Sequence, residues 1–260
     1  MSITLRTATR AAVAALALIT ATPATQAGVS LVQNGSFESN GGMGQMAGGI
    51  TYATGWTTGA SAFNFIGNNT ADSAGLRWSY SGLLGNLHAW GPNTPVANGG
   101  PVNNGFSSSP DGGYALVGGL NNPTSAVSQT INGLVVGSQY SLSFEWAQSQ
   151  MTNYSVSTTS GWRASLGGES HSTATPTLAG KGFGAWTAES FTFTATGTTE
   201  TLSFLPIGAM GAGAAALLDG VSLTQVAAVP EPGTMAMGLI VCGLAGVAAR
   251  RKARRVAVVA

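Results

Sequence analysis

The residues 139–146, QYSLSFEW, constrain the fold more than any other segment. Their even-numbered positions are large and apolar, from Tyr140 to Trp146, and their odd-numbered positions are polar. Alternation at a period of two places each set of side chains on its own face of a β-strand. The segment therefore predicts a half-buried strand that carries Glu145 on its outward face.

Several similar runs lie between residues 28 and 226, and Gly- or Asn-containing turn signals such as Asn132-Gly133 separate them. The clearest are residues 114–117, 126–131, 191–194, 202–205 and 221–224. No segment of 28–228 sustains a helical apolar period, and the Ala- and Gly-rich stretch 208–218 is interpreted as a loop. About ten short strands in such a chain favour a single all-β domain, a β-sandwich or a barrel. Residues 40–49 and 91–109 are predicted to be loops with a functional or mobile role.

The first 27 residues are typical of a secretory signal peptide. Arg6 and Arg10 precede the apolar run 11–19, and small residues then lead to a cleavage site after Ala27. The alternative, an amphipathic first helix of the domain, is disfavoured because residues 11–19 have no polar face. We expect the Sec translocon to export the chain.

Removing the two ends changes the charge of the protein. The whole chain carries a formal charge of +1, but residues 28–229 hold only Arg77, Arg163 and Lys181 against eight acidic residues, a net charge of −5. This domain lacks the basic footprint that nucleic-acid binding requires. Its chemistry also excludes disulfides and thiol nucleophiles, because the single cysteine, Cys242, lies in the C-terminal apolar run.

The domain shows no recognisable catalytic constellation. His88 and His171 are far apart and have no metal-ligand spacing, and no Gly-x-Ser-x-Gly motif is present. Glu145 is the only acid with a defined setting, and a solvated acid on a sheet face is the favoured interpretation. We therefore predict a protein that is not an enzyme.

The aromatic residues of the domain indicate ligand binding as an alternative to catalysis. Sugar rings stack on aromatic planes, and the domain combines many aromatic residues with many Asn, Ser and Thr. Trp146 continues the inward face of its strand and is assigned to the core. The predicted ligand-facing residues are Arg77, Trp78, Tyr80 and Trp90, with ordinary packing as the alternative for each.

Five motifs, in order, resemble the galactose-binding-like β-sandwich (jelly-roll) domains, which include several carbohydrate-binding modules. They are VQNGSFE at 32–38 followed by GW at 55–56, DGGYAL at 111–116, QTINGL at 129–134, the segment 137–146, and LLDGVSL at 217–223. The resemblance implies a jelly-roll sandwich over residues 28–226. It also implies a structural Ca²⁺ where the first segment meets the last strand, with Glu38 and Asp219 as carboxylate ligands. The alternative is that Glu38 ends a strand and Asp219 belongs to a turn; no other cofactor is expected.

The last 34 residues, 227–260, have a different chemistry. Val229, Pro230, Glu231 and Pro232 precede the 17-residue apolar run 233–249. As a helix this run would measure about 25 Å, barely enough for a hydrocarbon core of about 30 Å. The basic cluster that follows consists of Arg250, Arg251, Lys252, Arg254 and Arg255. Such a cluster stays cytoplasmic, and the two prolines keep the junction exposed to a protease.

Together these three elements resemble the PEP-CTERM sorting signal, which an exosortase recognises in Gram-negative bacteria. The resemblance implies a protein held briefly in the inner membrane and then processed to the cell surface or extracellular matrix, where such substrates are linked to exopolysaccharide and biofilm. We predict a non-enzymatic surface or matrix protein. The second hypothesis is a carbohydrate-binding, lectin-like module, and the third is a secreted hydrolase.

Overall fold

The computed structural model describes residues 28–59, 63–68, 76–80, 83–87, 89–90, 111–119, 125–151, 154–209 and 212–227. The predicted signal peptide, the sorting motif, the predicted membrane helix 233–249 and the basic cluster lie outside these residues, as does the loop 91–109. Residues 27–226 cluster as one compact unit.

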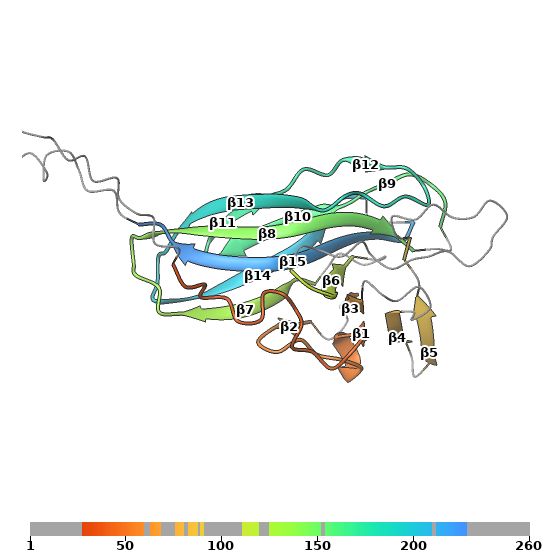
Figure 1. Ribbon diagram of the computed structural model, residues 1–260, viewed down its shortest axis with the longest axis horizontal. Helices are drawn as coiled ribbons and strands as arrows, with labels where there is room; N and C mark the ends of the chain where they lie inside the picture. Colours follow the sequence, from red (N-terminus) through yellow and green to blue (C-terminus); the bar gives the residue numbers. More distant parts are fainter. Residues whose placement is uncertain are drawn as a thin grey trace, which may run out of the picture. The chain divides into compact units, whose positions relative to one another are not determined.

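Two antiparallel sheets form this unit (Figure 1). The larger sheet has the order β1 (Gly44–Gln45), β3 (Asn64–Asn68), β6 (Tyr114–Gly118), β15 (Ala214–Gln225), β8 (Gln139–Gln150) and β13 (Thr187–Thr194). The smaller sheet has the order β11 (Glu169–Ser172), β10 (Gly161–Leu166), β14 (Thr199–Ile207), β7 (Val127–Asn132) and β2 (Thr57–Thr58). Strand β9 (Thr158–Thr159) pairs with β12 (Thr177–Leu178), and β4 (Leu76–Tyr80) pairs with β5 (Leu83–Leu87).

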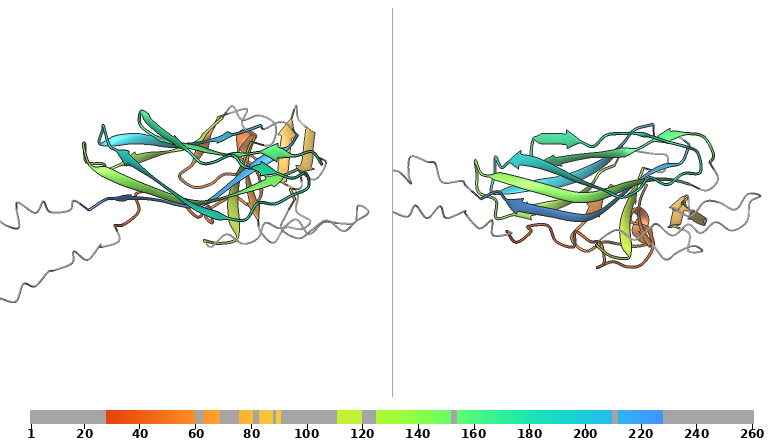
Figure 2. Two further views of the ribbon diagram at one scale, coloured as in Figure 1. Left: turned by 90° about the horizontal axis from the view of Figure 1, so that it is seen from above. Right: turned by 45° about the horizontal axis from the view of Figure 1, so that its top comes forward.

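The chain crosses repeatedly between the two sheets, which is the connectivity of a jelly roll. From β6 the chain crosses to β7 and returns in β8, and from β13 it crosses to β14 and returns in β15. Figure 2 shows the two layers from two further directions. In the described residues the one helical element is the 3-10 turn Ala47–Gly49, so the all-β sandwich prediction is confirmed.

The alternation in residues 139–146 places the side chains as predicted. Tyr140, Leu142, Phe144 and Trp146 are buried in the main core, and Glu145 is partly exposed on the opposite face. The strand continues four residues further than predicted, to Gln150, because its outward face is also covered from residue 147 onward.

Two expectations about local structure are wrong. The stretch 208–218 is not all loop, because β15 begins at Ala214, where alanines 214–216 are fully buried between neighbouring strands. Glycine and alanine weaken a strand prediction from sequence, but small side chains fit where layers approach closely. Residues 40–49 also form more than a loop, since they include β1 and the 3-10 turn.

Trp162 on β10 connects the two sheets through the core. Its ring is fully buried, and its indole Nε1 donates a hydrogen bond of 2.9 Å to the carbonyl oxygen of Leu217 on β15. Its edge packs on Phe204 of β14, with ring centroids 6.2 Å apart. A Cβ atom at Gly118 of β6 would lie 2.5 Å from this indole, so glycine makes room for the tryptophan.

We therefore expect Gly118→Ala to destabilise the domain, because the added methyl group would force the Trp162 ring or β6 to move. Overpacking of this kind costs about 1–3 kcal/mol, measurable as a lower midpoint in chemical denaturation. Gly168→Ala is the matched control, since a Cβ atom there meets open space. Equal stability of the two variants would contradict the packing argument.

Candidate functional site

The outward face of the larger sheet carries an apolar row that crosses four strands. Leu217 of β15 pairs with Ala147 of β8 on one side and with Val117 of β6 on the other, and Val117 pairs with Phe65 of β3. All four side chains are buried, and they form a second hydrophobic cluster separate from the main core. An outward sheet face with an apolar row needs a cover, and aromatic side chains provide part of it.

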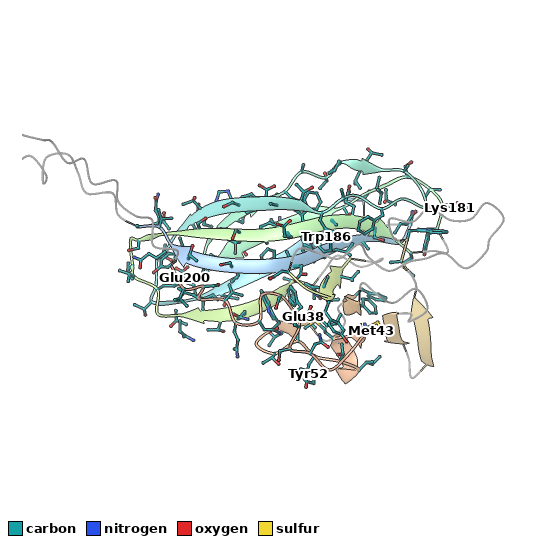
Figure 3. The ribbon with its side chains drawn as sticks, viewed as in Figure 1. Glu38, Met43, Tyr52, Lys181, Trp186 and Glu200 are labelled. Atoms are coloured by element: carbon teal, nitrogen blue, oxygen red, sulfur yellow. The ribbon has the colours of Figure 1, made fainter. Side chains whose placement is uncertain are left out.

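Four aromatic residues border this row, and we call them the aromatic rim: Phe63, Tyr154, Phe183 and Trp186. Each packs against the second cluster and is only partly buried. Trp186 directly precedes β13. Because Thr187 of β13 pairs with Trp146 of the antiparallel strand β8, Trp186 lies beside Ala147, the next residue of β8. Figure 3 shows Trp186 by the larger sheet and Lys181 toward one end of it.

Two buried glutamines at the end of β8 hold the loops around the rim. Gln150 donates from Nε2 to the carbonyl oxygens of Val156 (2.7 Å) and Ala212 (3.0 Å), and its Oε1 accepts from the backbone N–H of Lys181 (2.8 Å). Gln148 likewise donates to the carbonyl oxygens of Ser160 and Pro176. Because a buried amide that satisfies backbone groups on several loops fixes their relative positions, the rim is held by the interior of the sandwich.

Trp90 lies beneath this surface. Only 5% of the residue is exposed, its Nε1 donates to the carbonyl oxygen of Tyr154 (3.2 Å), and its own carbonyl accepts from Ser149 Oγ. The Lys181 ammonium lies 6.0 Å from the centre of the Trp90 ring, within cation–π range. The structure thus places this predicted ligand residue as a support for Lys181 and Tyr154.

The other predicted ligand residues are described only in part. Arg77, Trp78 and Tyr80 lie on β4, but their side chains are outside the described residues, as is His88. The sequence interpretation did not single out Phe183, Trp186 or Lys181. The signal that marks them is the segment GKGFGAW at 180–186, in which glycines alternate with large side chains just before a strand.

Glu38 and Asp219, the predicted calcium ligands, lie near two further acids. Glu38 Oε1 accepts from the backbone N–H groups of Gly113 (2.6 Å) and Tyr114 (2.8 Å). Asp219 is fully buried on β15 opposite Glu145, and its Oδ1 accepts from the N–H of Gly220. A Cβ atom at Gly220 would contact both Glu145 and Asp111, which places these acids around one bulge of β15.

The fit of this region to Ca²⁺ is incomplete. The segment that contains Glu38 does meet the last strand, since Val221 N–H donates to the carbonyl oxygen of Gly35 at 3.0 Å. However, among the residues that the structure describes, no three His, Cys, Asp or Glu side chains are arranged to hold a metal ion. Backbone carbonyls would have to supply the remaining ligands, and the calcium site stays a prediction.

His171 and Glu169 belong to a different place, the edge between the sheets. His171 Nε2 lies 3.0 Å from Glu169 Oε1, and its ring stacks on Phe191 of β13. Glu169 Oε2 accepts from Thr194 N–H, and this bond together with His171 lowers the pKa of the Glu169 carboxyl. The pair links β11 to β13 and therefore has a structural role.

Comparison with known families decides the nature of the C-terminal segment. Residues 228–252 match the family described as the PEP-CTERM protein-sorting motif. The chain carries a PEP-CTERM sorting motif. The matched segment includes Val229–Pro232 and the first three residues of the basic cluster, and it indicates an exported protein that is sorted to the cell surface.

Several solved structures resemble the domain at low sequence identity. A Stig cyclase, Fisc, from Fischerella sp. TAU is 16% identical, with a TM-score of 0.47 over 78% of this chain and 100% of the cyclase. The CBM22-1 xylan-binding domain of Paenibacillus barcinonensis Xyn10C is 13% identical, with a TM-score of 0.38 over 79% and 100% of the two chains. TmCBM61, solved with β-1,4-galactotriose, is 14% identical, with a TM-score of 0.39 over 76% and 99%.

Similarity at this level assigns neither a ligand nor a reaction to the chain. No curated protein matches the sequence. Within the part of the chain that the structure describes, no helix is both long and apolar enough to cross a membrane.

Proposed function

We propose that this protein is a non-enzymatic surface or matrix protein that an exosortase processes and that associates with extracellular polysaccharide. The sorting motif at 228–252 carries the proposal, because it connects the domain to export. In this proposal the segment 233–249 holds the chain in the inner membrane of a Gram-negative cell until the Pro-Glu-Pro junction is cut. The sandwich is then released to the cell surface or the biofilm matrix.

Replacing Pro230, Glu231 and Pro232 by alanine tests the sorting step. We expect full-length protein to accumulate in the membrane fraction of an exosortase-containing host, because the exposed, extended junction and its recognition residue are lost. Immunoblots of membrane and culture fractions provide the measurement. Alanine substitution of Thr234, Met235 and Met237, which follow Pro232 within the matched segment and leave Pro-Glu-Pro intact, is the control. Unchanged processing of the Pro-Glu-Pro variant would overturn the proposal.

A lectin-like activity is the second candidate, and the aromatic rim favours it. Trp186 and Phe183 are partly exposed on the segment that the Gln150 side chain holds at Lys181 N–H and the Gln148 carbonyl holds at Gly184 N–H, as a preorganised sugar platform requires. The rim replaces Trp90 as the surface for stacking, because the Trp90 ring is buried.

Trp186→Ala should weaken binding to a polysaccharide ligand about tenfold, since truncating an aromatic anchor removes a large share of the contact energy. Glycan-array screening followed by affinity electrophoresis measures the effect. Tyr52→Ala is the matched control: Tyr52 is 61% exposed but belongs to the loop before β2. Equal losses in the two variants, or binding unaffected by Trp186→Ala, would contradict a role for the rim.

Hydrolysis ranks third. A glycosidase requires two carboxyl groups that flank the bond to be cleaved. Asp219, which lies opposite Glu145, is fully buried, and its Oδ1 accepts from its own backbone neighbour. These features favour a structural role for this acidic region.

The predicted calcium site can be tested on the purified protein. An ion bound only by the folded state at about a hundred times its Kd would stabilise the domain by about 2.7 kcal/mol. We therefore expect EDTA to lower the Tm by about 5 °C or more and Ca²⁺ to restore it. Glu38→Gln should reduce this calcium-dependent shift, whereas Glu189→Gln on β13 should not. A Tm that EDTA leaves unchanged would remove calcium from the description.

A further inference from the structure

The charges of the domain are separated along its length. Glu145, Asp111 and Asp219 adjoin the bulge at Gly220, and Glu38 adjoins Gly112 beside Asp111. Glu200 lies at the end opposite Lys181 (Figure 3), and it adjoins Gly167, two residues before Glu169. In contrast, residues 146–168, 170–188 and 201–218 contain no Asp or Glu. These acid-free segments include the loops that the Gln150 side chain binds at Val156, Lys181 and Ala212. Among the residues that the structure describes, the end of the domain that carries Lys181 therefore has no acidic residue.

Lys181 lies at this acid-free end on a fixed backbone. Its φ of 63° is in the left-handed region, which a side chain other than glycine rarely adopts. The Gln150 carboxamide holds its N–H, and Trp90 lies beneath its ammonium group. The structure therefore fixes where this exposed cation is presented.

No described carboxylate pairs with Lys181. The nearest acid along β8 is Glu145, five residues before Gln150, and Glu189 on β13 lies opposite Phe144, still further from this end. A strand advances about 3.3 Å per residue, so Glu145 is about 16 Å away along β8. This separation of Glu145 from Gln150 exceeds the Debye length of about 8 Å at physiological salt, so the described acids of β8 and β13 are screened from the loop that Gln150 holds at Lys181.

Lys181 also belongs to the same surface as the aromatic rim. Trp90, which supports its ammonium, donates to the carbonyl of Tyr154, and the segment from Lys181 leads through Phe183 to Trp186. A stacking platform and a fixed cation are therefore adjacent. A neutral sugar would use the platform alone, whereas a sugar that bears an acid group would use both.

We propose that this end of the sandwich binds an anionic polysaccharide, with a sugar ring against the aromatic rim and a carboxylate or other acid group against the Lys181 ammonium. The inference rests on the proposed association with polysaccharide and specifies the class of its ligand. The acidic middle and far end of the domain would repel the same polymer, so binding would be confined to this end.

Comparing acidic polymers with their methyl esters distinguishes the contribution of the acid group to binding from that of the sugar backbone. The full chain, purified in detergent, is titrated with polygalacturonate and hyaluronan and with the methyl ester of each, which keeps the backbone and removes the charge. We expect the acidic form to bind about fivefold more tightly at low salt, the value of a partly exposed ion pair, and to lose this advantage in 0.5 M salt.

Substitutions locate the cation. Lys181→Asn removes the charge with a residue that tolerates the left-handed backbone, and it should reduce the affinity for the acidic polymer to that for its ester. Lys181→Arg should retain the preference. Arg163→Gln is the control, because Arg163 is an exposed cation on β10 of the other sheet. Circular dichroism confirms that each variant is folded.

The outcomes distinguish the two proposals. Equal binding of acidic and esterified polymers, or a preference that survives Lys181→Asn, would overturn the anionic ligand and leave polysaccharide association standing. Absence of binding to either form of both polymers and to a glycan array would contradict the polysaccharide association itself. An acid preference lost equally in Arg163→Gln would assign the effect to net charge and overturn the site.

Discussion

The buried indole of Trp162 is the contact on which the rest of the sandwich depends. It occupies the space between the sheets, and its hydrogen bond to the Leu217 carbonyl connects β10 to the central strand β15. Large buried aromatic side chains supply much of the apolar area that stabilises a domain, and a buried N–H must also find an acceptor. Gly118 on β6 follows from this constraint, because a Cβ atom there would lie 2.5 Å from the ring.

The position of β15 connects the core to both functional regions. Its inward residues face the main core, and its outward Leu217 is the centre of the apolar row beneath the aromatic rim. A few residues further, Asp219 and the bulge bring together the acidic residues of the predicted calcium region. The bulge of β15 at Gly220 therefore brings Asp219 together with Glu145 and Asp111, which other segments supply.

The far end of the domain shows how buried acids are accommodated away from this surface. Burial raises the pKa of the Glu200 carboxyl. Hydrogen bonds from the Thr196 side chain and from the N–H groups of Thr196 and Gly197 lower this pKa by more than burial raises it, so the pKa of Glu200 lies below its ordinary value. Glu200 thus fixes the turn before β14 as a carboxylate. The charge of Glu200 is bound by the hydrogen-bond donors of this turn, at the end of the domain opposite Lys181 (Figure 3).

The sequence by itself determined the all-β class, the inward face of residues 139–146 and the sorting motif, because period-two alternation and the Pro-Glu-Pro segment with its apolar run are local patterns. It missed β15 at Ala214, the apolar row and the rim. Strand propensity does not reveal buried alanines, and residues 117, 147, 186 and 217 become neighbours only through strand pairing. Only the tertiary structure decided that Trp90 is buried and that Lys181 stands apart from the acids in the described part of the chain, since burial and charge separation depend on how distant segments pack.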